Sequence, residues 1–100
     1  MEGIIAAAPT PVDLTGVPQK NDFLEHCDWA LNNGCDGLNI LGSTGEANSF
    51  DIATRKKIMK WSAENLPKER LMVGTATPSL SETIFLTRYA DDLGYNIALV

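Results

Sequence analysis

Short apolar runs alternate along the chain with longer segments whose apolar residues recur every three or four positions. The short runs are bounded by glycine, proline or polar residues and predict strands at residues 4–8, 36–41, 71–76 and 96–100. Consecutive apolar residues without alternation are typical of parallel strands that helices cover. The pattern therefore predicts a parallel sheet with helical connections.

The first longer segment predicts a helix over residues 22–33. Asn21 offers an N-cap oxygen, and Gly34 ends the helical pattern. The apolar stripe that we expect to face the sheet consists of Phe23, Leu24, Cys27, Ala30 and Leu31.

A second predicted helix follows Ser49 or Asp51, either of which can cap it, and ends at Pro67. Its expected inner face carries Ile52, Ile58, Met59, Ser62, Ala63 and Leu66. We expect the charged residues to form a solvated face, which consists of Arg55, Lys56, Lys57, Lys60 and Glu64.

The third predicted helix begins after Ser79, which stands at capping-box spacing from Glu82, and ends near Leu93 before Gly94. Its apolar spacing predicts a stripe of Leu80, Ile84, Thr87 and Ala90 or Asp91.

The predicted order is β-α-β-α-β-α-β, which is the N-terminal half of a (β/α)₈ TIM barrel if the strands pair sequentially. Residues 1–100 would then be part of a single barrel domain whose remainder lies outside this chain. A doubly wound sheet is the alternative, because local patterns do not fix the strand order.

Charge and composition exclude several classes of function. The 100 residues carry a net charge of −5, which argues against nucleic-acid binding and against an anionic membrane surface. No apolar run approaches the length of a membrane span, and the N-terminus lacks the pattern of a secretion signal. Cys27 and Cys35 lack metal-site spacing, so we expect reduced thiols, a cytoplasmic location, and neither metal nor cofactor.

The strongest candidate site is the stretch from Gly42 to Glu46, which follows the second predicted strand. Two glycines, Gly42 and Gly45, flank the hydroxyls of Ser43 and Thr44, so backbone N–H groups and hydroxyls can converge on a small anion. Ligands of α/β folds meet the C-terminal ends of strands, where other hydroxyls also lie, namely Thr10, Thr75 and Thr77. The alternative is a turn whose hydroxyls bond to their own backbone.

Common catalytic motifs do not fit this stretch. Gly45 is followed by Glu46 rather than by the lysine of a P-loop, and the spacing is not that of a nucleophile elbow. No lysine falls within a predicted strand, and His26 is expected on a solvated helix face. Tyr95 enters the fourth strand at its N-terminal end, which is the wrong end for catalysis.

Nearly the whole chain resembles the N-terminal part of the dihydrodipicolinate synthase / N-acetylneuraminate lyase family. The resemblance rests on residues 42–46 between the flanking segments 33–38 and 47–50, on Thr10-Pro11-Val12-Asp13 with Gly16, and on Val73-Gly74-Thr75.

The resemblance implies a (β/α)₈-barrel class I aldolase or lyase that forms a Schiff base with pyruvate or another 2-oxo acid. Ser43, Thr44 and Gly45 would bind the carboxylate of this small-molecule substrate, and Thr44 would join a proton relay with a tyrosine. The family also implies a homo-oligomer, in particular a homotetramer.

In the family the Schiff-base lysine lies on the sixth strand and the tyrosine on the fifth, whereas this chain ends in the fourth predicted strand. We therefore expect residues 1–100 alone to be inactive. A non-catalytic α/β module that binds a small carboxylate, or assembles with a partner chain, is the second hypothesis. The second substrate of the parent enzyme is left open.

Overall fold

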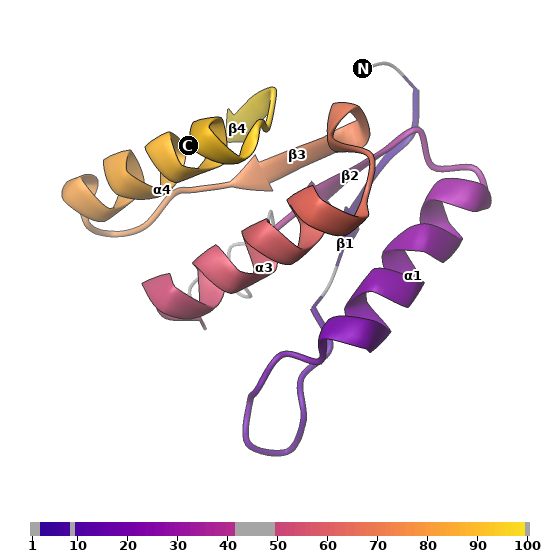
Figure 1. The fold of residues 1–100 in the computed structure, drawn as a ribbon, viewed down its shortest axis with the longest axis horizontal. Helices are drawn as coiled ribbons and strands as arrows, with labels where there is room; N and C mark the ends of the chain where they lie inside the picture. The colour runs from indigo at the N-terminus through magenta and orange to yellow at the C-terminus, as the bar shows by residue number, and fades with distance from the viewer. Residues whose placement is uncertain (1–2, 9, 42–49, 100) are drawn as a thin grey trace.

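A computed structural model describes residues 3–8, 10–41 and 50–99, which form a four-stranded sheet with helices against one face (Figure 1). Each strand and α-helix lies within two residues of its predicted position, whereas the 3₁₀-helix before the third strand was not predicted. The elements are β1 (Ile5–Ala8), α1 (Lys20–Asn32), β2 (Gly37–Ile40), α3 (Ile52–Asn65), the 3₁₀-helix η1 (Lys68–Arg70), β3 (Leu71–Gly74), α4 (Leu80–Leu93) and β4 (Ile97–Leu99).

The four strands lie in the order β1-β2-β3-β4, and all neighbours are parallel. Ala8 pairs with Ile40, and Ile40 pairs with Val73, so the C-terminal ends of the first three strands meet at one edge. This sequential order confirms the half-barrel prediction. A doubly wound sheet would require the strand order to reverse.

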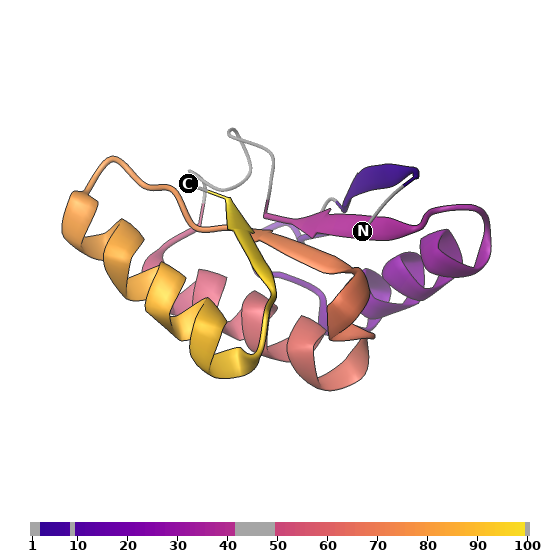
Figure 2. The same cartoon turned by 90° about the horizontal axis from the view of Figure 1, so that it is seen from above.

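The three α-helices in the described part of the chain lie on the same face of the sheet (Figure 2). Right-handed crossovers between sequential parallel strands place them there. On that face, Leu38, Ile40, Leu71 and Val73 are at most 1% exposed. They pack with helix residues to form the core, which includes Phe23, Cys27, Ile58, Met59 and Leu86.

The opposite face of the sheet, here called the open face, carries the alternate strand residues. In the part of the chain that the structure describes, no helix covers it (Figure 2). Ile5 is 41% exposed and Leu99 is 39% exposed, and both lie on this face. The open face consists of Ile5, Ala7, Gly37, Asn39, Met72, Gly74, Ile97 and Leu99.

Helix α1 begins two residues before the predicted position, with Gln19 rather than Asn21 as its N-cap. Gln19 makes no side-chain capping bond. A β-bridge joins Val12 to Pro18, and Gln19 N donates to Pro11 O at 2.9 Å. The loop that these two contacts close, rather than a capping side chain, therefore determines where α1 begins.

The caps of the other two helices agree with the sequence. Asp51 caps α3, since its Oδ1 accepts from Thr54 N at 2.8 Å. Ser79 Oγ accepts from Glu82 N at 3.4 Å at the start of α4. Gly94 ends α4 with a φ of 92°, a left-handed conformation that suits glycine.

The predicted apolar stripe of α4 is wrong at Leu80 and Ile84, whereas Ala90 is buried as predicted. Leu80 is 75% exposed and Ile84 is 44% exposed. The buried residues are Thr83, Leu86 and Ala90. Thr77 N donates to Thr83 Oγ1 at 2.9 Å, so the connection before α4 satisfies the Thr83 hydroxyl and turns it inward.

Candidate functional site

The C-terminal edge of the sheet is where the sequence predicts the ligand site. The motif residues Ser43, Thr44 and Gly45 lie outside the described residues, so their roles stay predictions. Leu41, directly before the motif, is 2% exposed and has a φ of 57°. A left-handed leucine is strained, by about 1–2 kcal/mol. Such strain occurs at functional turns when the surrounding packing holds it.

Arg55 corrects the prediction of a solvated charged face on α3. Its side chain is only 2% exposed. Arg55 Nη2 donates to Gly74 O at 2.9 Å, and Nη1 donates to Ala76 O at 3.0 Å. The guanidinium therefore holds the end of β3 and the residues after it, and burial lowers the pKa of Arg55.

Sequence reasoning missed Arg55 although a signal was present. Arg55 stands three residues before Ile58 and four before Met59, so helical spacing puts it on the inner face. The charge of Arg55 suggested a solvent-exposed side chain instead. Two backbone carbonyls at the C-terminal edge accept its N–H groups. These contacts join residues far apart in the sequence, so local sequence patterns do not reveal them.

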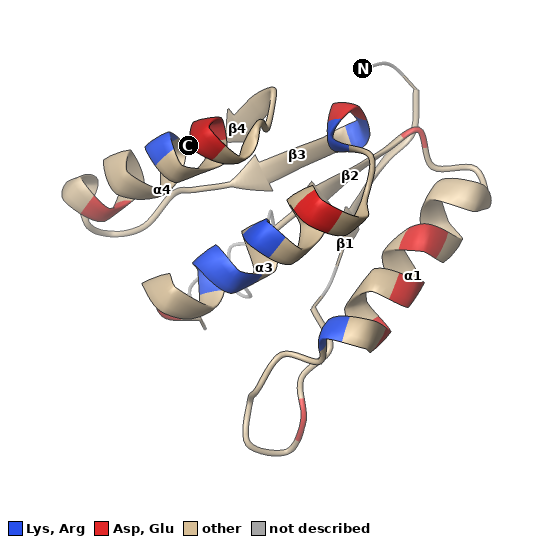
Figure 3. Ribbon diagram, viewed as in Figure 1, with Lys and Arg blue, Asp and Glu red and all other residues tan. Residues whose placement is uncertain are grey.

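The remaining charged residues of α3 follow the prediction more closely. Lys57, Lys60 and Glu64 are exposed. Lys56 is partly buried, and its ammonium lies 5.2 Å from the ring centre of Phe85 and 4.9 Å from that of Tyr89. Figure 3 shows the basic residues along α3 and acidic residues along α1.

Two of the three threonines predicted near the site serve the local fold. Thr75 is fully buried, and its Oγ1 lies 2.8 Å from Thr87 Oγ1 on α4. Thr77 Oγ1 donates to Ser79 O at 2.7 Å and accepts from Ser79 N at 3.0 Å. Thr10 is buried at the end of β1. The hydroxyls of Thr75 and Thr77 are thus occupied within the turn and helix that follow β3.

Every lysine of the sequence lies outside the described strands. Lys20 is exposed at the start of α1. Lys68 Nζ donates to Leu93 O at 3.2 Å, at the edge opposite the motif. The described strands therefore present no amine on either face of the sheet.

Tyr95 and His26 have structural or surface roles. Tyr95 is 6% exposed, and its hydroxyl donates to Met59 O at 2.7 Å. Burial raises the pKa of Tyr95 well above its usual range. His26 is exposed on α1, as predicted, and stacks on Trp29 with ring centres 6.5 Å apart.

Both cysteines are free thiols. Cys27 is buried in the core and Cys35 is partly buried. Burial raises the pKa of the Cys27 thiol to about 12, with Asp28 as a smaller cause. Among the residues that the structure describes, no group of three or more His, Cys, Asp or Glu side chains could hold a metal ion.

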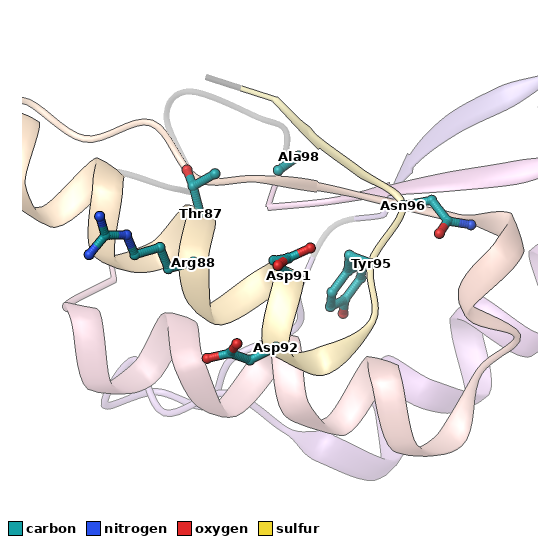
Figure 4. Close-up of a pocket in the computed structure, with 7 residues that line it drawn as sticks. All are labelled: Thr87, Arg88, Asp91, Asp92, Tyr95, Asn96 and Ala98. Atoms are coloured by element: carbon teal, nitrogen blue, oxygen red, sulfur yellow. The ribbon is translucent and has the colours of Figure 1, made fainter.

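A hollow of about 490 Å³ lies beside α4 and β4 (Figure 4). Its lining includes Asp91, Asp92, Tyr95 and Asn96 at the C-terminal end of α4 and the start of β4. Because these residues lie at the N-terminal end of β4, the hollow is remote from the edge where the motif follows β2. It is therefore not the predicted anion site.

A smaller hollow, of about 260 Å³, lies at the C-terminal edge. Asp51 and Glu82 line it together with Arg55 and Thr77. Two carboxylates make this hollow unfavourable for an anion.

A search of the described residues for a membrane-spanning helix found no segment with the necessary length and hydropathy.

The comparison with known sequences identifies the family. Residues 1–100 match the dihydrodipicolinate synthetase family throughout. This chain belongs to that family. The 4-hydroxy-tetrahydrodipicolinate synthase of Coxiella burnetii (strain Dugway 5J108-111) is 34% identical over 99 residues, which are 98% of this chain and 34% of that protein. The chain thus spans about a third of the length of the relatives it matches.

Solved structures agree with the family and with the TIM-barrel fold. CdNal from Clostridium difficile, solved with mannosamine, is 25% identical with a TM-score of 0.89, over 98% of this chain and 34% of that one. YagE from E. coli K12, a prophage protein of the dihydrodipicolinic acid synthase family solved with pyruvate, is 28% identical with a TM-score of 0.86. That match covers 96% of this chain and 33% of YagE.

Proposed function

We propose that this chain is the carboxylate-binding part of a class I aldolase or lyase that forms a Schiff base with pyruvate or another 2-oxo acid. The family match over residues 1–100 carries the proposal. The pyruvate bound to YagE, a relative of the same fold, supports the class of substrate. The proposal further includes a cytoplasmic, homo-oligomeric parent protein, in the form of a homotetramer.

Ser43, Thr44 and Gly45 would hold the carboxylate of the 2-oxo acid. Hydroxyl and backbone N–H donors are suited to this anion, and the stretch follows β2 at the edge where barrel enzymes bind ligands. Thr44 would also pass a proton between the bound substrate and a tyrosine from outside this chain. That role makes Thr44 the catalytic residue of the segment.

The covalent step requires a lysine from the part of the protein beyond these residues. Its amine nitrogen bonds to the keto carbon, and the keto oxygen leaves as water to give an imine. Borohydride reduces such an imine to a stable amine. Pyruvate followed by borohydride should therefore add a permanent mass to the full-length protein, as measured by intact-protein mass spectrometry.

The same treatment of residues 1–100 alone should give no adduct, and borohydride without pyruvate serves as the control. An adduct on the short chain would contradict the assignment of the lysine to the missing part. No adduct on the full-length protein would favour the second hypothesis, a non-catalytic module that binds a small carboxylate or assembles with a partner chain.

The role of Thr44 can be tested separately in the full-length enzyme. Thr44→Val removes the hydroxyl at similar volume, and loss of a proton-transfer group should lower turnover by about 100-fold or more. Thr15→Val is the matched control, since Thr15 lies in the exposed loop between β1 and α1. Wild-type turnover in Thr44→Val would refute the relay.

A further inference from the structure

Asn39 is the one polar side chain on the open face among the strand residues that the structure describes. It lies on β2 between Ala7 of β1 and Met72 of β3, and Met72 pairs in turn with Ile97 of β4. The flanking residues Leu38 and Ile40 are buried against the helices. The alternation of a strand therefore turns Asn39 to the opposite face.

The carboxamide oxygen of Asn39 has no hydrogen-bond partner among the described residues. This oxygen, Oδ1, is buried. Ala7 and Met72, which lie beside Asn39 on the neighbouring strands, have no hydrogen-bond donor in their side chains. A buried polar atom without a partner destabilises a fold, so an apolar residue of this size would suit the folded state better.

The residue as a whole is only partly buried, and strand alternation directs its side chain to the open face. The two ends of a carboxamide have nearly the same shape, and a half-turn about χ2 exchanges the donor and the acceptor. Asn39 can therefore present either group to a ligand. In a (β/α)₈ barrel this face is the interior, and Asn39 precedes the Gly42–Glu46 stretch by three residues.

We propose that Asn39 is a specificity-determining residue whose carboxamide hydrogen-bonds the 2-oxo acid held inside the barrel. The proposal rests on the proposed function, because it takes the 2-oxo acid as the ligand. It adds a binding group on β2 itself, separate from the hydroxyls of Ser43 and Thr44. An unpaired polar group that weakens the fold is then explained by the ligand it binds.

The test uses the full-length protein with pyruvate as the probe. Borohydride trapping at a series of pyruvate concentrations gives the half-saturating concentration for wild type and for Asn39→Leu. We expect this concentration to rise about tenfold in Asn39→Leu, as for the loss of one hydrogen bond. The melting temperature without pyruvate should equal or exceed that of wild type. A structural role for the amide would instead lower it.

Met72→Leu, in the same row of the sheet, is the matched control and should trap pyruvate as wild type does. Asn39→Ala is the second variant, in case leucine does not fit, and should also raise the half-saturating concentration. A concentration within twofold of wild type in both Asn39 variants overturns the proposal. A lowered melting temperature in both Asn39 variants overturns it as well.

Failure of the proposed function gives a different result. If wild type forms no adduct but pyruvate raises its melting temperature, the Schiff base is wrong, and Asn39 is judged by whether Asn39→Leu loses that increase. If pyruvate neither forms an adduct nor raises the wild-type melting temperature, both proposals are wrong.

Discussion

Arg55 shows how one buried residue can hold the edge of the sheet on which the site depends. Its two terminal nitrogens bind the carbonyls of Gly74 and Ala76, on either side of Thr75. Two acceptors at the end of β3 therefore depend on one guanidinium. Lysine has a single donor nitrogen and would not reproduce this two-point contact.

Replacing Arg55 should destabilise the protein. Arg55→Met keeps the apolar stem but leaves both carbonyls without their donor, at a cost of about 2–3 kcal/mol in the free energy of unfolding. Urea denaturation measures this change. Lys57→Met, on the exposed side of the same helix, should stay within about 0.5 kcal/mol of wild type. Equal effects of the two substitutions would refute a special role for Arg55.

The two cysteines should differ sharply in reactivity. With a pKa of about 12, Cys27 is almost entirely a neutral thiol at pH 8, and it is also buried. The thiolate is the reactive form. Iodoacetamide at pH 8 should therefore alkylate Cys35 at least about tenfold faster than Cys27, as followed by peptide mass spectrometry. Comparable rates in the native protein, with urea-unfolded protein as the control, would contradict the buried position of Cys27.

At the scale of the elements, Asp51 links the start of α3 to pH. Hydrogen bonds from Thr54 lower the pKa of Asp51 below its ordinary value of 3.8. A lowered folded pKa means that the carboxylate contributes stability above the ordinary value. This contribution is lost as the pH falls through the folded pKa.

Asp51→Asn should keep a capping oxygen and remove this part of the pH dependence. Thermal unfolding between about pH 5 and pH 2 should therefore show a shallower loss of stability in Asp51→Asn than in wild type. Asp51→Ala should lower stability near neutral pH, because it removes the cap itself. If Asp51→Asn and wild type lose stability in parallel, Asp51 does not contribute to acid unfolding.

The order of the elements was predictable because apolar spacing and capping residues are local signals. The sequence located every described strand and the cap of α4, Ser79, and it offered Asp51 as one of two candidate caps for α3. The inner face of α4 was not predictable in the same way. Thr83 is buried because a hydrogen bond from Thr77 satisfies it, and Leu80 lies outward although it is more apolar.

The site was predictable only in part. Spacing placed the Gly42–Glu46 stretch directly after β2, and the structure confirms that β2 ends at Ile40. Two features of the described residues that the sequence did not predict are tertiary. The Arg55 side chain can be buried because backbone carbonyls at and after the end of β3 accept its N–H groups. Asn39 stands out only once strand pairing shows that its neighbours on the open face are apolar.

At the scale of the whole molecule, the two outer strands and the open face determine how residues 1–100 behave alone. Among the described strands, β1 and β4 each pair on one side only. Unpaired parallel edges beside an apolar face favour association between chains. The relatives are about three times longer, and in them further chain is available to cover both features.

Residues 1–100 in isolation should therefore associate as their concentration rises, because association buries the open face and pairs the strand edges. Sedimentation velocity from micromolar to about 100 μM would measure this. Leu99→Lys places a charge on β4 at the open face and should shift the chain toward monomer. Trp29→Lys is the control, since Trp29 is also exposed, at 62% against 39% for Leu99, but lies on α1, on the helical side of the sheet. If the Trp29 variant dissociates and the Leu99 variant does not, the helices rather than the open face mediate association.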